Sequence, residues 1–100
     1  MLWAIYCLDK PNAAATRSKL LKVHRDYLDS NLPNIFFSGP LQSDDAEESF
    51  GSLFILNLKD RAEAQVFIGN EPFNNAGVFE KVMIFRMRKG RFNPQLADVT

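Results

Sequence analysis

The only histidine of the chain, His24, lies in the middle of the segment SKLLKVHRDYL, residues 18–28. Apolar residues recur at helical spacing in this segment, at Leu20, Leu21, Tyr27 and Leu28. His24 falls on the same side of the predicted helix, so its ring is expected to point inward. An imidazole exchanges protons near neutral pH, and a carboxylate at one ring nitrogen fixes the tautomer and stabilises the imidazolium. His24 is therefore a candidate general base, although a histidine bonded only to backbone groups would be a core residue.

Two glycine-containing segments carry groups that can hydrogen-bond a small ligand. In SGP, Gly39 has no side chain to keep a ligand away from the backbone, and Ser38 offers a hydroxyl. Pro40 follows directly, and the Gly-Pro pair has the alternative role of ending a strand. In GSL, Ser52 offers a second hydroxyl. These four residues are candidate ligand-binding residues.

Several other chemistries lack the residues that they need. One histidine and one distant cysteine are too few strong ligands for zinc, so no metal is expected. The acidic segment LQSDDAEES lacks the alternating ligands and the glycine of a calcium loop. SGP and GSL lack the strained elbow of a serine hydrolase and the several glycines of a phosphate-binding loop, so no nucleotide cofactor is expected. Cys7, in an apolar run with no basic residue beside it, is expected to be a buried, unreactive thiol.

Length and charge limit the chain to one compact domain. Of its 100 residues, 46% are hydrophobic and nine are phenylalanine, which suffices for a core. Twelve basic and twelve acidic residues cancel, and no long run of one sign occurs, so no nucleic-acid partner is expected. The first apolar run, MLWAIYCL, is too short for a membrane span and lacks the basic lead and cleavage site of a signal peptide. A cytoplasmic protein without a membrane partner is expected.

Alternating apolar and turn-rich segments predict six elements. In chain order these are a strand over 2–8, a helix over 13–31, strands over 34–40 and 50–58, a helix over 59–70 and a strand over 78–88. Gly39 and Pro40 are expected to terminate the second strand, and Asp60 to favour the start of the second helix. Residues 71–77 are expected to form a turn-rich elbow. The order βαββαβ predicts an α+β, ferredoxin-like fold, with two helices on one face of a four-stranded antiparallel sheet.

The strands of this predicted sheet are apolar on both faces. Residues 3–7 and 53–56 are apolar without interruption, whereas a strand with one solvated face alternates apolar and polar residues. The face without helices must therefore be covered. A second copy of the same sheet would cover it in a symmetric homodimer. The alternative is that the C-terminal tail, 89–100, folds over it.

Three segments, in order and at matching separations, resemble the YciI-like family of YCII-related domains, within the dimeric α+β barrel superfamily. They are HRDYL, FFSGPLQSDD and GSLFILNLKDRAEAQVFIGNEPFNNAGVFEKVMIFRM. The most specific features are His24 followed by Gly39 and Pro40, the GSL segment, and the EPF…AGVFE block. The resemblance gives one domain over 1–88 and leaves 89–100 as a tail. It implies a ferredoxin-like monomer and a homodimer through the open sheet faces.

The resemblance also implies an active site built on a histidine and a carboxylate. Carried onto this sequence, the pair is His24 and Glu71, with Phe73 of the same EPF segment as a candidate ligand contact. Relatives usually have Asp in place of Glu71 and Leu in place of Arg25. The acid thus keeps its charge on a side chain one carbon longer. The alternative for Glu71 is a solvated loop acid.

Two functions stay open from the sequence. The first is an enzyme in which His24, assisted by Glu71, moves a proton on a small polar organic ligand, in an isomerisation, elimination or hydrolysis. The second is a non-catalytic small-molecule-binding or accessory dimeric module that uses the same cleft. A hydrogen bond between the two side chains, with the histidine open to a pocket, would favour the enzyme.

Overall fold

The elements below come from a computed structural model that describes all 100 residues. The strands are β1 (Leu2–Asp9), β2 (Ile35–Gln42), β3 (Ser49–Asn57) and β4 (Phe79–Met87). The α-helices are α1 (Ala14–Ser30), α2 (Arg61–Gly69) and the single turn α3 (Pro72–Asn75), and two 3-10 helices are η1 (Leu32–Asn34) and η2 (Pro94–Leu96). None of these helices combines the length and the apolar character that crossing a membrane requires.

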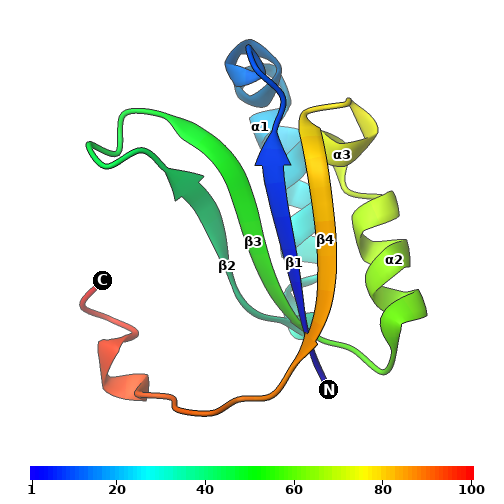
Figure 1. Cartoon of the computed structure of the whole chain (residues 1–100), viewed down its shortest axis with the longest axis vertical. Helices are drawn as coiled ribbons and strands as arrows, with labels where there is room; N and C mark the ends of the chain where they lie inside the picture. The colour runs from blue at the N-terminus through cyan, green and yellow to red at the C-terminus, as the bar shows by residue number, and fades with distance from the viewer.

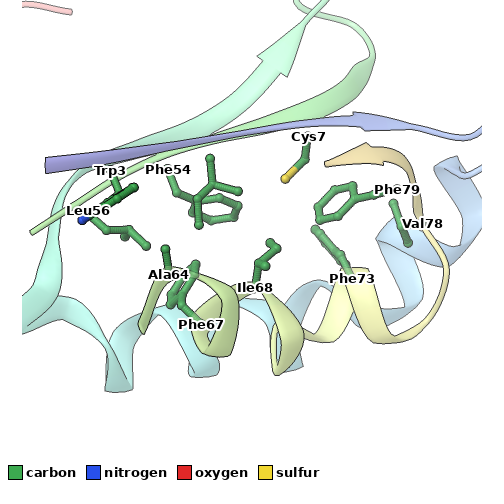
Figure 2. Close-up of a cluster of buried hydrophobic side chains, with 11 residues drawn as sticks. Trp3, Cys7, Phe54, Leu56, Ala64, Phe67, Ile68, Phe73, Val78 and Phe79 are labelled. Atoms are coloured by element: carbon green, nitrogen blue, oxygen red, sulfur yellow. The ribbon is translucent and has the colours of Figure 1, made fainter. Parts of the chain in front are cut away.

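The four strands form one antiparallel sheet in the order β2-β3-β1-β4. In Figure 1, α1 lies behind this sheet, α2 lies to the right of β4, and no helix lies in front of the sheet, while Figure 2 shows the helices on one side of the strands. This is the α+β, ferredoxin-like arrangement that the order βαββαβ predicted.

The hydrophobic core fills the space between the sheet and the helices (Figure 2). Its eleven buried residues are Trp3, Ile5, Cys7, Phe54, Leu56, Ala64, Phe67, Ile68, Phe73, Val78 and Phe79. The alternate β1 residues Trp3, Ile5 and Cys7 belong to this cluster, because successive strand side chains point to opposite faces. Figure 2 shows Trp3 and Leu56 at one end of the cluster and Phe73 of α3 at the other. The core therefore extends from the sheet to the short helix α3.

The start of α2 follows from two acidic side chains. The carboxylate of Asp60, the residue before the helix, accepts a hydrogen bond from the backbone N–H of Glu63 at 2.9 Å. Glu63 in turn accepts the backbone N–H of Lys59 at 2.7 Å. Both contacts satisfy N–H groups that have no partner within the helix. The expectation that Asp60 marks this helix start is confirmed.

β2 does not end at Gly39 and Pro40, so that part of the sequence prediction was wrong. Both residues lie inside the strand, paired with Leu53 and Ser52 of β3. β2 is an edge strand, and a proline on an edge loses no ladder hydrogen bond when the side with the missing N–H faces away from the sheet. The Gly-Pro pair is therefore tolerated within the strand.

The elbow over 71–77 contains a single helical turn that the sequence prediction did not include. Pro72 starts α3, and the Glu71 carboxylate before it accepts the backbone N–H of Asn74 at 3.1 Å. Gly77, with φ +76°, then turns the chain into β4. A side chain cap therefore makes a helix from a segment whose composition is typical of a turn.

The face of the sheet opposite the helices, here called the open face, is apolar. Strand pairing places on it apolar residues from all four strands, which include Ala4, Tyr6, Phe37, Leu53, Ile55, Met83 and Phe85. Phe37 is 64% exposed and Phe85 is 55% exposed. The open face therefore carries large apolar side chains that the chain itself leaves in contact with solvent.

The C-terminal tail does not fold over this open face. In Figure 1 it leaves the end of β4, passes below the sheet and reaches the side of β2. There, Phe92 packs against Phe36 with ring centres 5.5 Å apart, and Lys89 lies over the Phe92 ring. Phe37 and Phe85 stay exposed. The alternative in which the tail covers the open face is thus wrong.

Candidate active site

The structure brings His24 and Glu71 into direct contact, although they lie 47 positions apart in the sequence. His24 comes from the inner side of α1, and Glu71 from the residue that precedes α3. The contact joins Nδ1 of His24 and Oε1 of Glu71. A carboxylate only accepts hydrogen bonds, so Nδ1 carries the hydrogen and Nε2 is the acceptor nitrogen of the neutral ring. Glu71 is therefore not a solvated loop acid.

The Glu71 side chain has no exposed surface, and both of its oxygens have partners. Oε1 contacts His24, and Oε2 accepts the backbone N–H of Asn74. Burial of a carboxylate is costly unless such partners compensate it. The cap of α3 thus also aims Glu71 at the histidine.

The imidazole of His24 is held between aromatic rings. It stacks on Phe73 with ring centres 3.9 Å apart and an angle of 9° between the planes. Phe54 of β3 meets it edge-on at 6.5 Å. With Glu71 at Nδ1, these contacts fix both the position and the tautomer of the ring.

The second ring nitrogen of His24, Nε2, is free. It has no hydrogen-bond partner in the protein. It also keeps some solvent contact, because the only sealed side-chain nitrogen or oxygen without a partner is Nε1 of Trp3. His24 thus combines a buried, oriented Nδ1 with an accessible Nε2, which is the arrangement of a general base.

A buried ion pair lies two helical turns before His24 on α1. Nε and Nη2 of Arg17 donate to the two carboxylate oxygens of Asp9, at 2.6 Å and 3.2 Å. Nη2 also donates to the carbonyl oxygen of Gly51 at 2.7 Å and to Oγ of Ser52 at 3.0 Å. The guanidinium carbon of Arg17 lies 4.7 Å from the centre of the Phe73 ring. The Phe73 ring therefore links the ion pair to the histidine.

These buried charges act on neighbouring groups. Burial raises the pKa of Cys7 from its ordinary value of 9.0 to about 12, and the negative charges of Glu71 and Asp9 add to this effect, while Arg17 opposes it. Burial and then Glu71 likewise raise the pKa of Tyr27, whose hydroxyl donates to the carbonyl oxygen of Phe67 at 2.7 Å. Cys7 is fully buried and keeps its proton near neutral pH, so it is no nucleophile.

A cleft of about 710 Å³ opens beside this cluster. It lies between the first half of α1, the segment that leads into it, and the hairpin that joins β2 to β3. Asp9 and Arg17 line it, and Leu21 marks its extent along α1, one turn before His24. The Leu21 side chain is thus half exposed in the cleft, although it was expected on the buried side of the helix. His24 and Glu71 are not among the lining residues.

The remaining residues expected at the site are divided by the fold. Ser52 is buried and bonded to Arg17, and Phe73 is fully buried and stacked on His24. Ser38, Gly39 and Pro40 lie on the edge strand β2, and no contact joins them to the histidine–glutamate pair. The structure therefore gathers His24, Glu71, Phe73 and Ser52 and leaves the SGP segment outside the cluster.

Arg17 and Asp9 are the part of the cluster that the sequence analysis missed. Arg17 precedes His24 by seven residues, which is two helical turns, so it shares the inward side of α1. A charged residue at that position of an amphipathic helix was the available signal. The acid that pairs with it, at the end of β1, had no such signal.

No group of three or more histidine, cysteine, aspartate or glutamate side chains is placed to hold a metal ion.

Comparisons with known proteins agree with this fold. A family model for the YCII-related domain matches residues 1–88. The structure is similar to 5-chloro-2-hydroxyhydroquinone dehydrochlorinase (TftG) from Burkholderia phenoliruptrix AC1100, solved in complex with 2,5-dihydroxybenzoquinone. The TM-score is 0.84 at 29% identity, over 90% of this chain and 96% of that one. PA3566 from Pseudomonas aeruginosa shares the fold with a TM-score of 0.54 at 14% identity, over 90% of this chain and 93% of that one. No curated protein matches the sequence.

Proposed function

The chain belongs to the family of YCII-related domains, and on this premise we propose that its His24–Glu71 pair is a general base acting on a small polar organic ligand. The observation that carries the proposal is the asymmetry of the histidine. Nδ1 is bonded to a fully buried carboxylate, while Nε2 has no partner and keeps solvent contact. A histidine that only fills the core would not need one bonded and oriented ring nitrogen together with one free and accessible ring nitrogen.

In the proposed reaction, Nε2 of His24 takes the proton of an acidic O–H or C–H group of the ligand. The bonding electron pair stays on the ligand, and the imidazolium that forms is stabilised by Glu71 at Nδ1. In an elimination, that electron pair expels a leaving group, so that one proton and one anion are lost together. The Phe73 stack keeps the ring in place while its charge changes.

Among isomerisation, elimination and hydrolysis, the structural similarity to the dehydrochlorinase favours elimination from a hydroxylated ring. That enzyme's substrate carries a chlorine and three hydroxyl groups on one ring, as its name states. Loss of a proton and a chloride ion from such a ring needs a base and needs no cofactor. His24 as the base, with the buried carboxylate of Glu71 beside it, meets that requirement.

Chloride release from 5-chloro-2-hydroxyhydroquinone by the purified protein tests the proposal directly. We expect turnover by the wild type and a loss of kcat of at least about 100-fold in His24→Gln, since general base catalysis contributes 10²–10⁴-fold. Glu71→Gln removes the charge but keeps an oxygen for the Asn74 N–H, so the fold is preserved while kcat falls on the order of 10²-fold. Glu71→Asp keeps the negative charge on a shorter side chain, so we expect it to retain more activity than Glu71→Gln. Lys22→Gln, on the exposed side of α1, is the matched control and has no effect.

The state of the histidine gives a second test that does not depend on the substrate. The chain has one histidine, so the ring ¹⁵N signals need no assignment. In the wild type we expect the neutral ring to carry its hydrogen on Nδ1, and in Glu71→Gln we expect a mixture of the two tautomers. Wild-type binding of ring compounds without any turnover would instead support the non-catalytic binding module.

We further propose that the protein is a homodimer in which the open faces of two sheets pack together. The open face carries apolar and aromatic residues from all four strands, and the tail leaves Phe37 and Phe85 exposed. A symmetric pair of identical apolar faces removes both from water at once. The occupant of the open face is therefore a second copy of this chain.

The mass of the protein in solution tests the dimer. Phe85→Asp places a charge on the open face, whereas Val66→Asp places one on an equally exposed apolar residue of α2, away from that face. We expect the wild type and Val66→Asp to have the mass of a dimer by light scattering, and Phe85→Asp that of a monomer. A monomeric wild type would refute the proposal.

A further inference from the structure

We propose that Arg17 is the anchor for an ionised oxygen of the ligand, and that the cleft it lines takes a planar ring whose hydroxyl group ionises near neutral pH. This inference rests on the proposed function, because it specifies the ligand on which His24 acts. It adds a binding residue and a ligand class that neither the histidine–glutamate pair nor the sequence motifs supply.

The guanidinium of Arg17 is held on three sides. Asp9 binds Nε and Nη2, the Gly51 carbonyl and Ser52 hydroxyl bind Nη2, and the ring of Phe73 lies against the guanidinium carbon. A long side chain held in this way loses no further conformational entropy when it binds a ligand. Arg17 is therefore preorganised rather than mobile.

The fourth side of the guanidinium, Nη1, is open. It has no hydrogen-bond partner, and it is not among the sealed atoms, so it keeps solvent contact although Arg17 as a whole is only 8% exposed. Arg17 is also a lining residue of the 710 Å³ cleft. Nη1 thus has two unpaired N–H donors on a residue that lines a cavity large enough for a ring compound.

Arg17 and His24 are placed to act on one ligand. They lie seven residues apart on the same side of α1, which is a rise of about 10 Å along the helix. Both pack on the Phe73 ring, with the guanidinium carbon of Arg17 4.7 Å and the imidazole centre of His24 3.9 Å from the ring centre, so the two groups share one aromatic neighbour. Leu21, one turn before His24, gives the cleft an apolar wall between them. His24 lies one turn beyond the end of the cleft at Leu21, so a flat ring anchored at Arg17 has to extend along this wall past Leu21 to present a second group to His24.

The other charges of the cleft do not select an anion by themselves. Asp9 neutralises Arg17, and Lys10 is opposed by Glu47, Glu48 and Glu80, all exposed at the rim and screened by salt. Selection therefore comes from the two directed N–H bonds of Nη1 in a partly desolvated place, where charge-assisted bonds are strong. When His24 takes a proton from the ligand, the negative charge left on a conjugated oxygen is stabilised at Arg17.

The test uses the coloured compound 2,5-dihydroxybenzoquinone as the probe, with binding followed by calorimetry and by its visible absorbance. Arg17→Lys keeps a charge for Asp9 but lacks the free fork of nitrogens. The double variant Arg17→Met/Asp9→Asn removes the ion pair without leaving a buried charge alone, so at least one variant is expected to fold. We expect both to weaken probe binding at least tenfold. His24→Gln is expected to change binding less than threefold while lowering kcat at least about 100-fold.

A neutral analogue, 2,5-dimethoxybenzoquinone, is the matched control, and its binding is expected not to depend on Arg17. Failure of the anchor and failure of the proposed reaction are distinguishable. Arg17-dependent binding without chloride release from the chlorinated substrate would uphold the anchor and refute the elimination. Probe binding that is unchanged in both Arg17 variants, or no probe binding by the wild type at millimolar concentration, would overturn the anchor.

Discussion

Phe73 contacts both polar parts of the site, the His24–Glu71 pair and the Arg17–Asp9 pair. Its ring is fully buried, stacks on the imidazole of His24 and lies under the guanidinium of Arg17. Stacked aromatic pairs contribute about 0.5–1.5 kcal/mol beyond the area that they bury. The ring therefore positions both side chains, even though it has no surface with which to touch a ligand.

Phe73→Leu is expected to lower kcat on the chlorinated substrate roughly tenfold or more, because the imidazole loses the surface that holds its plane, and a misplaced catalytic group costs up to about 10²-fold. KM is expected to change less. Phe79→Leu, in the same core but without contact to His24, is the matched control and keeps kcat. Equal losses of kcat in the two variants would show that core packing alone matters.

The buried thiol of Cys7 gives the protein a defined response to alkaline pH. The unfolded chain releases this proton near pH 9.0, whereas the folded protein holds it up to about pH 12. The resulting stabilisation is complete below pH 9.0 and is lost as the pH rises through this window, at about 1.4 kcal/mol per pH unit. The free energy of unfolding, measured with urea between pH 9 and 10, is expected to fall less steeply with pH in Cys7→Ala than in the wild type. Parallel declines would contradict the role of the thiol.

At the scale of the elements, the one-turn helix α3 has to start and stop within four residues. Glu71 starts it and Gly77, with φ +76°, ends it. Because residues with a Cβ adopt this left-handed conformation at a cost of roughly 1–2 kcal/mol, Gly77→Ala is expected to reduce the free energy of unfolding by about that amount. Gly69→Ala, at the end of α2 with free space around it, is the control and is expected to be neutral or stabilising. Urea unfolding measures both.

The sequence predicted the elements better than their junctions. The order βαββαβ and the inward His24 follow from periodicity, which a whole helix or strand repeats several times. The interior position of Pro40 depends on β2 being an edge strand, and α3 depends on one side chain bond from Glu71. Neither fact is local, so no pattern of neighbouring residues could predict them.

The candidate site was predictable only in part for the same reason. The contact of His24 with Glu71 is the one that the family resemblance implied, and the structure now shows the atoms that form it. The Arg17–Asp9 pair needed the register of α1 against the end of β1, which spacing within the helix does not give. The SGP segment matched a ligand-binding pattern but lies on the edge strand β2, with no contact to the His24–Glu71 pair.

At the scale of the whole molecule, the tail over 89–100 lies outside the residues that the family model matches. Its aromatic contact is Phe92 on Phe36. A chain truncated after Arg88 is therefore expected to keep its circular dichroism spectrum, and to lose only a few degrees of Tm through the exposure of Phe36. Phe92→Ser in the full chain is expected to reproduce that loss. Unfolding of the truncated chain would show that the tail is part of the domain.

The strand order β2-β3-β1-β4 alternates between the two halves of the chain, since β1 and β2 come from the first half and β3 and β4 from the second. The chemistry is divided in the same way: Asp9, Arg17 and His24 precede the exposed hairpin at 43–48, and Ser52, Glu71 and Phe73 follow it. Neither half holds a working site. If the chain were cut in that hairpin and the pieces expressed apart, turnover of the proposed substrate would report their reassembly.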